Sequence, residues 1–476
     1  MYRRGTALPK AVSGFTQLIE TRTTRVQKPR RRPVLFVWAV IWAALLLLSS
    51  FGTERAYTQQ SSGEQESVRT GGTPIRIGGS LSLTGTYEDP SSMMYDAYTL
   101  WAKQINERGG LLGSPVELII EDDRSSPERA AEIYRELIEE EEVDLLLSPY
   151  GTPITLAAAE VTEEYGYVLM AAASAGEETW SRGYSRVFGM YAQGEHFFTG
   201  FLDLCARNGL NSVSILYERN TFNRDAANGA HLWAGRMGIG RIRLYGFDPQ
   251  TVGPEDGQED GQEGTLEKIW QQVEKGNSEA LIVCSYPPSG YRILELLEES
   301  EYCPEALGMT ITPIDPDFYK RAAEIGDVCL AKPESAAAET EAETEAGGGG
   351  GKTGNSLAEG VCAPSLWEPN ERIPFPGTDR FIEAFEEHAS KEPTYHAASA
   401  YSACRILEEA ITLTRGVDHE ALARYIFGLD TVTILGRFKV DHTGKQIGHN
   451  PMLVQWQEGR KEIVYPASVE TAEPMF

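Results

Sequence analysis

Short apolar runs alternate with segments of helical period through most of this 476-residue chain, and the whole alternation occurs twice. The first series has apolar runs at residues 75–83, 116–122, 143–149 and 167–173, and the second has them at 212–218, 241–247, 279–285 and 305–311. Strands that alternate with helices are typical of βαβ units, which form parallel sheets. The sequence therefore predicts an α/β protein with two Rossmann-like lobes, and the chain is long enough to bury a core in each.

The remaining parts of the body follow a different pattern. Residues 379–427 contain three further helical patterns, and the stretch LVQWQEGRKEIVYP predicts a hairpin that turns near Gly459. Two segments, 249–264 and 334–355, are acidic, rich in glycine and almost free of large apolar residues. Such composition cannot offset the entropy of ordering, so we expect both segments to be disordered insertions.

The N-terminal region has the pattern of an export signal. Three arginines, residues 30–32, precede an apolar run at 34–51. A positive flank before such a run stays cytoplasmic, so the rest of the chain is expected outside, in the periplasm or the extracellular space. Residues 1–56 fit a cleaved signal peptide or an uncleaved membrane anchor, because the run is long for the first and barely long enough for the second. Residues 57–73 read as a flexible linker.

Charge excludes one class of partner. The net charge is −27, although the first 56 residues contain ten basic and two acidic residues. The body of the chain is therefore strongly acidic, and a nucleic acid is not an expected partner because binding to phosphates needs a basic surface.

The chain lacks the motifs of the common enzyme classes. It has no GxSxG or HExxH motif, no CxxC pair and no His/Cys spacing suited to a metal. Ala346 and the glycine run at 347–351, followed by Lys352 and Thr353, loosely match a phosphate-binding loop, but an acidic run precedes them where that loop needs a strand. We therefore predict no enzymatic activity, no catalytic residue, no cofactor and no metal.

Two hydroxyl-bearing segments follow neighbouring strands of the first series. Thr152 is expected to cap a helix whose first residue is Pro153, and Ser174 follows the run at 167–173. The free N–H groups at a helix start suit a ligand carboxylate. Capping alone would also explain both residues, since Ser174 and Glu177 form a capping-box pattern. Their topology favours a shared site, because neighbouring parallel strands end at one sheet edge.

Two aromatic residues follow strands of the second series. Phe222 comes after the run at 212–218, and Tyr286 comes after the run at 279–285. Rings at these places can close over a ligand, or they can pack beneath their own loops.

In combination, several stretches of residues 74–466 resemble the type I periplasmic solute-binding proteins of the leucine/isoleucine/valine-binding class. The stretches are IRIGGSLSLTG, INERGGLLG, VELIIEDDRSSPERA, LLLSPYGTPITLAAAEVTEEYG, RGY at 182–184 and YHAASAY. The resemblance implies two lobes joined by three crossovers. Lobe 1 would comprise 74–192 and 332–430, lobe 2 would comprise 193–331 and 431–466, and 467–476 would be a tail.

The resemblance also implies a set of ligand-binding residues. They are Thr152, Thr155, Ala173, Ser174, Phe222, Tyr286 and His396. Where the family usually pairs the ligand ammonium with a glutamate, this sequence has Thr310 and Ile311, and Asp315 is the acidic candidate that remains.

The function implied by the resemblance is extracytoplasmic solute binding for an ABC importer. Such a protein captures an amino acid, here branched-chain-like, or a small amide, and delivers it to the permease subunits. The alternative is a ligand-sensing ectodomain of a signalling system, tethered to the membrane by residues 34–51.

Overall fold

The computed structural model describes residues 72–248, 265–326 and 356–475, apart from 371 and 374. The expected signal or anchor segment, most of the linker and both expected insertions lie outside these residues. None of the described helices combines the length and apolar character needed to cross a membrane.

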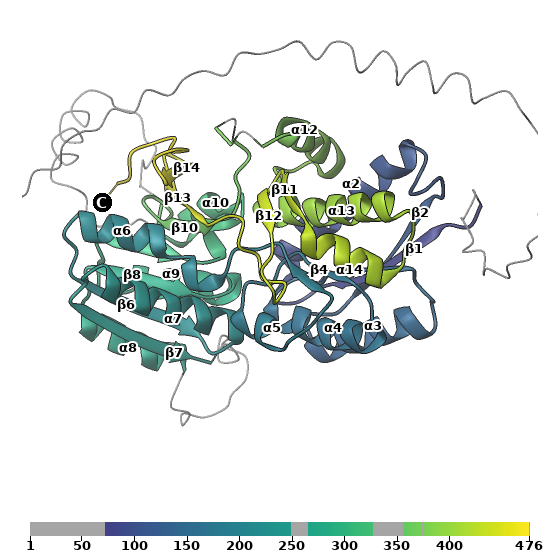
Figure 1. Ribbon diagram of the computed structural model, residues 1–476. Coiled ribbons are helices and arrows are strands. Elements are labelled where there is room, and N and C mark those ends of the chain that lie inside the picture. The colour runs from purple at the N-terminus through teal and green to yellow at the C-terminus, as the bar shows by residue number, and fades with distance from the viewer. Residues whose placement is uncertain (1–71, 249–264, 327–355, 371, 374, 476) are drawn as a thin grey trace, which may run out of the picture. The chain divides into compact units, whose positions relative to one another are not determined.

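The first sheet has five strands in the order β2-β1-β3-β4-β5, and all its pairs are parallel. The strands are β1 (Ile75–Leu81), β2 (Val116–Asp122), β3 (Leu145–Leu147), β4 (Leu169–Ala171) and β5 (Val187–Gly189). The helices of this part are α2 (Glu88–Glu107), α3 (Pro127–Glu139), α4 (Thr152–Tyr165), α5 (Glu177–Ser181), α12 (Thr378–Ala389), α13 (Tyr395–Thr414) and α14 (His419–Gly428). Although α13 is distant in sequence, it packs against α2 (Figure 1).

The second sheet has seven strands in the order β14-β13-β10-β9-β8-β6-β7. They are β6 (Ser212–Glu218), β7 (Arg241–Phe247), β8 (Ala280–Cys284), β9 (Ala306–Met309), β10 (Cys362–Ser365), β13 (Met452–Gln457) and β14 (Arg460–Tyr465). The helices that accompany them are α6 (Thr199–Arg207), α7 (Thr221–Arg236), α8 (Leu266–Gly276), α9 (Pro287–Glu298) and α10 (Phe318–Ile325). Strands β6 to β10 are parallel, and β13 and β14 add an antiparallel hairpin. All five residues of β8 are buried, as a central parallel strand requires.

This topology confirms the expected fold class. The chain leaves the first sheet after β5, returns to it at α12 after β10, and goes back to the second sheet at β13, which gives three crossovers. The C-terminal hairpin and the three late helices also occur where the sequence indicated them.

One segment differs from the expected division. Residues 362–365, expected in the stretch 332–430 of lobe 1, form β10 between β9 and β13 of the second sheet. A second unexpected feature is the small hairpin of β11 (Asp430–Thr433) and β12 (Gly436–Lys439). Strand β10 was difficult to predict because CAPS is short and contains a proline, which is unusual within a sheet.

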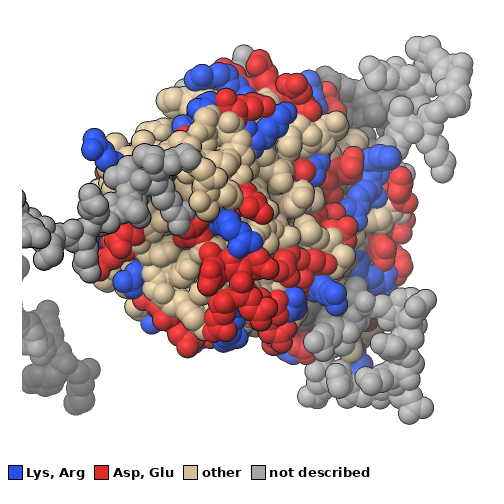
Figure 2. Space-filling model, turned by 90° about the vertical axis from the view of Figure 1, so that its right-hand side faces the viewer, with Lys and Arg blue, Asp and Glu red and all other residues tan. Residues whose placement is uncertain are grey.

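Acidic side chains are conspicuous on the face shown in Figure 2, where basic ones are fewer. A face of this kind repels the phosphates of a nucleic acid.

Candidate functional site

One pocket gathers residues from the carboxyl ends of strands in both sheets. Thr152 follows β3, Ala173 follows β4, Phe222 follows β6 and Tyr286 follows β8. The full lining is Tyr150, Gly151, Thr152, Ala173, Ala175, Tyr191, Phe197, Phe222, Tyr286, Ile311 and Tyr395. The cavity between these side chains is only about 10 Å³, which is room for about one water.

Helix α4 begins at the floor of this pocket. Its N-cap is Gly151, with φ 83° and ψ 147°, and Thr152 is the first helical residue. The expectation that Thr152 would be the cap is therefore wrong by one position, because the chain turns through a left-handed conformation that favours glycine. The Thr152 hydroxyl accepts a hydrogen bond from the backbone N–H of Gly176 at 3.1 Å.

Ser174 and Thr155 support the pocket from behind. The hydroxyl of Ser174 lies 2.9 Å from that of Thr179 and 3.4 Å from that of Thr152. Thr155 donates to the carbonyl of Pro149 at 3.5 Å. Both side chains are fully buried and neither is among the pocket-lining residues. The structure thus places Thr152 and Ala173 at the pocket, with Ser174 and Thr155 one layer further in.

The expected aromatic residues meet rings from the first sheet. Tyr286 stands edge-on to Tyr87, with ring centroids 4.6 Å apart, and lies 6.2 Å from Phe222. Tyr87 also packs near Tyr150 at 5.8 Å. Since Phe222 and Tyr286 follow strands of the second sheet while Tyr87 and Tyr150 belong to the first, the two halves contact each other through aromatic rings.

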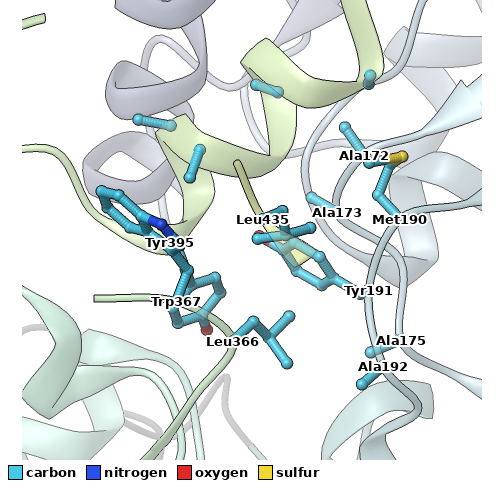
Figure 3. Packing of buried hydrophobic residues seen from close by; sticks show 14 of the residues in the cluster. Ala172, Ala173, Ala175, Met190, Tyr191, Ala192, Leu366, Trp367, Tyr395 and Leu435 are labelled. Carbon is cyan, nitrogen blue, oxygen red and sulfur yellow. The ribbon is translucent and has the colours of Figure 1, made fainter. Parts of the chain in front are cut away.

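His396 lies beside the pocket on helix α13. Its Nδ1 is 2.6 Å from the hydroxyl of Tyr191, and its ring is 4.1 Å from that of Tyr395. Burial and the nearby Lys461 lower the pKa of His396 to about 3, so the imidazole is neutral at physiological pH. Figure 3 shows Tyr191 and Tyr395 within the same buried cluster as Ala173 and Ala175.

Asp315, the expected partner of a ligand ammonium, is engaged elsewhere. Its carboxylate accepts a hydrogen bond from Arg321 at 3.0 Å and another from the backbone N–H of Asp317 at 3.0 Å. Asp315 lines a neighbouring hollow together with His396 and does not line the pocket that contains Thr152.

Residues 74–309 match the family model described as periplasmic binding protein. The chain belongs to the periplasmic binding protein family. A curated relative, the Leu/Ile/Val-binding protein homolog 7 of Brucella suis, is 19% identical over 386 residues, which cover 78% of this chain and 86% of the relative.

Solved structures with a similar fold are known for this periplasmic binding protein. A branched-chain amino acid transporter substrate-binding protein of Streptococcus pneumoniae, in complex with isoleucine, has a TM-score of 0.65 at 15% identity and covers 83% of this chain and 100% of its own. A solute-binding protein of Rhodopseudomonas palustris, in complex with 3,4-dihydroxybenzoic acid, has a TM-score of 0.63 at 16% identity and covers 82% and 95%.

A buried carboxyl group that was not predicted from the sequence also lies in this periplasmic binding protein. Glu218, the last residue of β6, accepts hydrogen bonds from the backbone N–H of Tyr286 at 3.3 Å and from the side-chain amides of Asn220 and Asn223 at 2.9 and 3.0 Å. Ser289 also bonds to it. Burial raises the pKa of Glu218 to about 7. The available signal was a charged residue at the end of an otherwise apolar strand.

Several lining residues were also missed. They are Tyr150, Gly151, Ala175, Tyr191, Phe197, Ile311 and Tyr395. In the described part of this periplasmic binding protein, no three His, Cys, Asp or Glu side chains are grouped so that they could hold a metal ion.

Proposed function

We propose that this chain is an extracytoplasmic solute-binding protein that captures a small solute with a carboxylate or amide end and delivers it to the permease of an ABC importer. The proposal includes two lobes with the expected boundaries, except that β10 belongs with the second. Family membership supports solute binding. The proposed size of the solute is supported by two solved structures of similar fold, whose ligands are isoleucine in one case and 3,4-dihydroxybenzoic acid in the other.

The observation that carries the proposal is the start of α4 at the pocket. Its N-cap makes no side-chain hydrogen bond, and its first turn contains no acidic residue. The first N–H groups of a helix have no partner within the helix and carry the positive end of its dipole. A carboxylate placed beside Thr152 would therefore gain both a hydroxyl donor and these amides.

The proposal is tested by thermal unfolding of the purified full chain in the presence of L-amino acids, their amides and their deaminated acids. A cleft ligand must raise the melting temperature in a concentration-dependent way. If no compound of these three classes does so, the proposed solute class is wrong. Uptake of the identified compound by cells that lack the chain then tests delivery to a permease.

The place of the carboxylate is tested with Thr152→Ala, with Thr152→Ser as the matched control that keeps the hydroxyl. Loss of a hydrogen bond to a charged group costs about 1.5–3 kcal/mol, so Thr152→Ala should weaken binding by about 10- to 100-fold. Thr152→Ser should bind nearly as the parent does. If all three proteins bind with equal affinity, the ligand carboxylate does not bind at the start of α4.

A further inference from the structure

Three long helices begin at or beside the pocket, and at the start of one of them, α9, the carboxyl group of Glu218 accepts a hydrogen bond from the backbone N–H of Tyr286. Helices α4, α9 and α13 contain 14, 12 and 20 residues, and their N-caps are Gly151, Tyr286 and Thr394. None of these caps makes a side-chain hydrogen bond, and none of the three first turns contains Asp or Glu. The positive ends of the dipoles of α4 and α13 therefore meet the pocket without an acidic side chain, whereas Glu218 lies at the start of α9.

None of the described residues that line the pocket has a charged side chain that could offset the positive potential at these helix starts. Glu218 does not line the pocket and accepts hydrogen bonds from the side chain of Asn223 and the backbone N–H of Tyr286, and Asp315 is paired with Arg321. The neighbouring His396 is neutral. A ligand ammonium would consequently find no carboxylate partner here, whereas a ligand carboxylate would be stabilised.

An unpartnered hydroxyl points to the same class of ligand. Tyr395, the first residue of α13, is only 1% exposed and lines the pocket. Its hydroxyl oxygen makes no hydrogen bond in the structure. Burial raises the pKa of Tyr395, so the group keeps its proton and remains a donor. A buried donor without an acceptor is unusual in a native protein and needs an explanation.

We propose that the pocket, once the rings that fill it move apart, selects small carboxylic acids that carry no ammonium group, and that the Tyr395 hydroxyl is a specificity-determining donor to an oxygen of the ligand. This inference rests on the proposed function and names the class of its solute. Aromatic faces attract an ammonium, and that attraction is worth about 30-fold in affinity when the ion is desolvated. An unpaired buried charge costs about 150-fold or more, so the deaminated acid should bind better.

The ligand class is tested by calorimetric titration of the full chain with two matched pairs. The pairs are L-leucine with 4-methylpentanoate and L-phenylalanine with 3-phenylpropanoate, whose members differ only in the ammonium group. In each pair that binds, we expect the acid to bind at least about 5-fold more tightly. An amino acid that binds as tightly as its acid would overturn the inference and leave the proposed function intact. Absence of binding by both pairs, and by the amides, would contradict both.

The role of Tyr395 is tested with Tyr395→Phe, with Tyr95→Phe on the exposed side of α2 as the matched control. Tyr95 is 39% exposed. Tyr395→Phe should weaken binding of the acid by about 10-fold or more, because it removes a hydrogen bond to a charged group. It should leave the melting temperature of the unliganded protein unchanged or raised, because it removes an unsatisfied buried donor.

If Tyr395 served only to stabilise the fold, its replacement would lower the melting temperature and leave the affinity for the acid unchanged. If Tyr395→Phe lowers the melting temperature and binds the acid as the parent does, Tyr395 is not a ligand donor. Tyr95→Phe should change neither quantity.

Discussion

The buried carboxyl group of Glu218 should give this protein a pH-dependent stability that a single substitution removes. Burial raises the pKa of Glu218 from 4.5 to about 7 in the folded protein. Between these two values the folded state binds more protons than the unfolded chain, so the free energy of unfolding falls as the pH rises. A difference of about 2.5 between the two pKa values corresponds to about 3 kcal/mol.

The surroundings of Glu218 allow this effect to be assigned to one group. The titratable side chains that act on it or that it acts on are Tyr87, Tyr286 and Cys284. Burial raises the pKa of each of them, to about 12 for Tyr87, so all three are uncharged below pH 8. Only Glu218 in this group changes its charge between pH 4.5 and 7.

The protonated form can also be accommodated. The side-chain oxygen of Asn223 has no hydrogen-bond partner, and a turn of its amide would present that oxygen to the new O–H of Glu218. The same turn would receive the amide of a glutamine. Glu218→Gln is therefore a substitution that removes the charge and keeps the shape.

The assay is urea unfolding of the parent and of Glu218→Gln at a series of pH values from 4.5 to 8. We expect the parent to be the more stable or equal at pH 4.5 and to lose about 3 kcal/mol relative to the variant by pH 7.5. The comparison removes the contributions of titratable groups that both proteins share. One such group is His396, which is neutral when buried, so that stability falls as the pH drops below about 6.5. Parallel curves for the two proteins would refute the reasoning.

Two further predictions concern stability alone. Lys461 and Glu368 form an ion pair at 3.2 Å, and their side chains are only 7% and 6% exposed. Lys461→Met should therefore lower the free energy of unfolding by about 3–5 kcal/mol, because it leaves a buried charge unpaired. Adding Glu368→Gln should restore most of this loss. Urea unfolding measures both, and a double variant no better than the single one would contradict the argument. Gly110→Ala would place a Cβ 1.9 Å from the carbonyl oxygen of Ser114 at φ +81° and should cost more than about 2 kcal/mol. The control Gly109→Ala, at φ +98° with nothing within 4 Å, should cost only about 1 kcal/mol of backbone strain in the same measurement.

The regular part of the fold was accessible from the sequence because long apolar strands carry a local signal. The expected runs at 212–218, 241–247 and 279–285 match β6, β7 and β8 closely. Strand β10 was missed since its pairing with β9 and β13 is a tertiary property of four residues.

The sequence allowed those site residues to be predicted whose position follows from the topology of the sheets. Thr152, Ala173, Phe222 and Tyr286 follow strand ends, and parallel sheets bring such ends to one edge. Tyr395 could not be found in this way, because it begins a helix that returns to the first sheet more than 200 residues after β5.

The ion pair of Asp315 with Arg321 was not predicted either, for a different reason. Its partner Arg321 lies six residues further along the chain. From the sequence, Asp315 was only a candidate partner of a ligand ammonium, and the contact with Arg321 is known only from the fold.

The order of strands in the second sheet has a consequence for synthesis of the chain. Strand β10 is paired on one side with β9 and on the other with β13, which follows α12, α13 and α14 in the chain. Until β13 has emerged from the ribosome, the backbone N–H and C=O groups on that side of β10 have no strand to bind. The native sheet is thus completed late, after the three helices that lie between β10 and β13 have been synthesised. A prematurely terminated product would carry the same open edge permanently, as a site for aggregation or proteolysis.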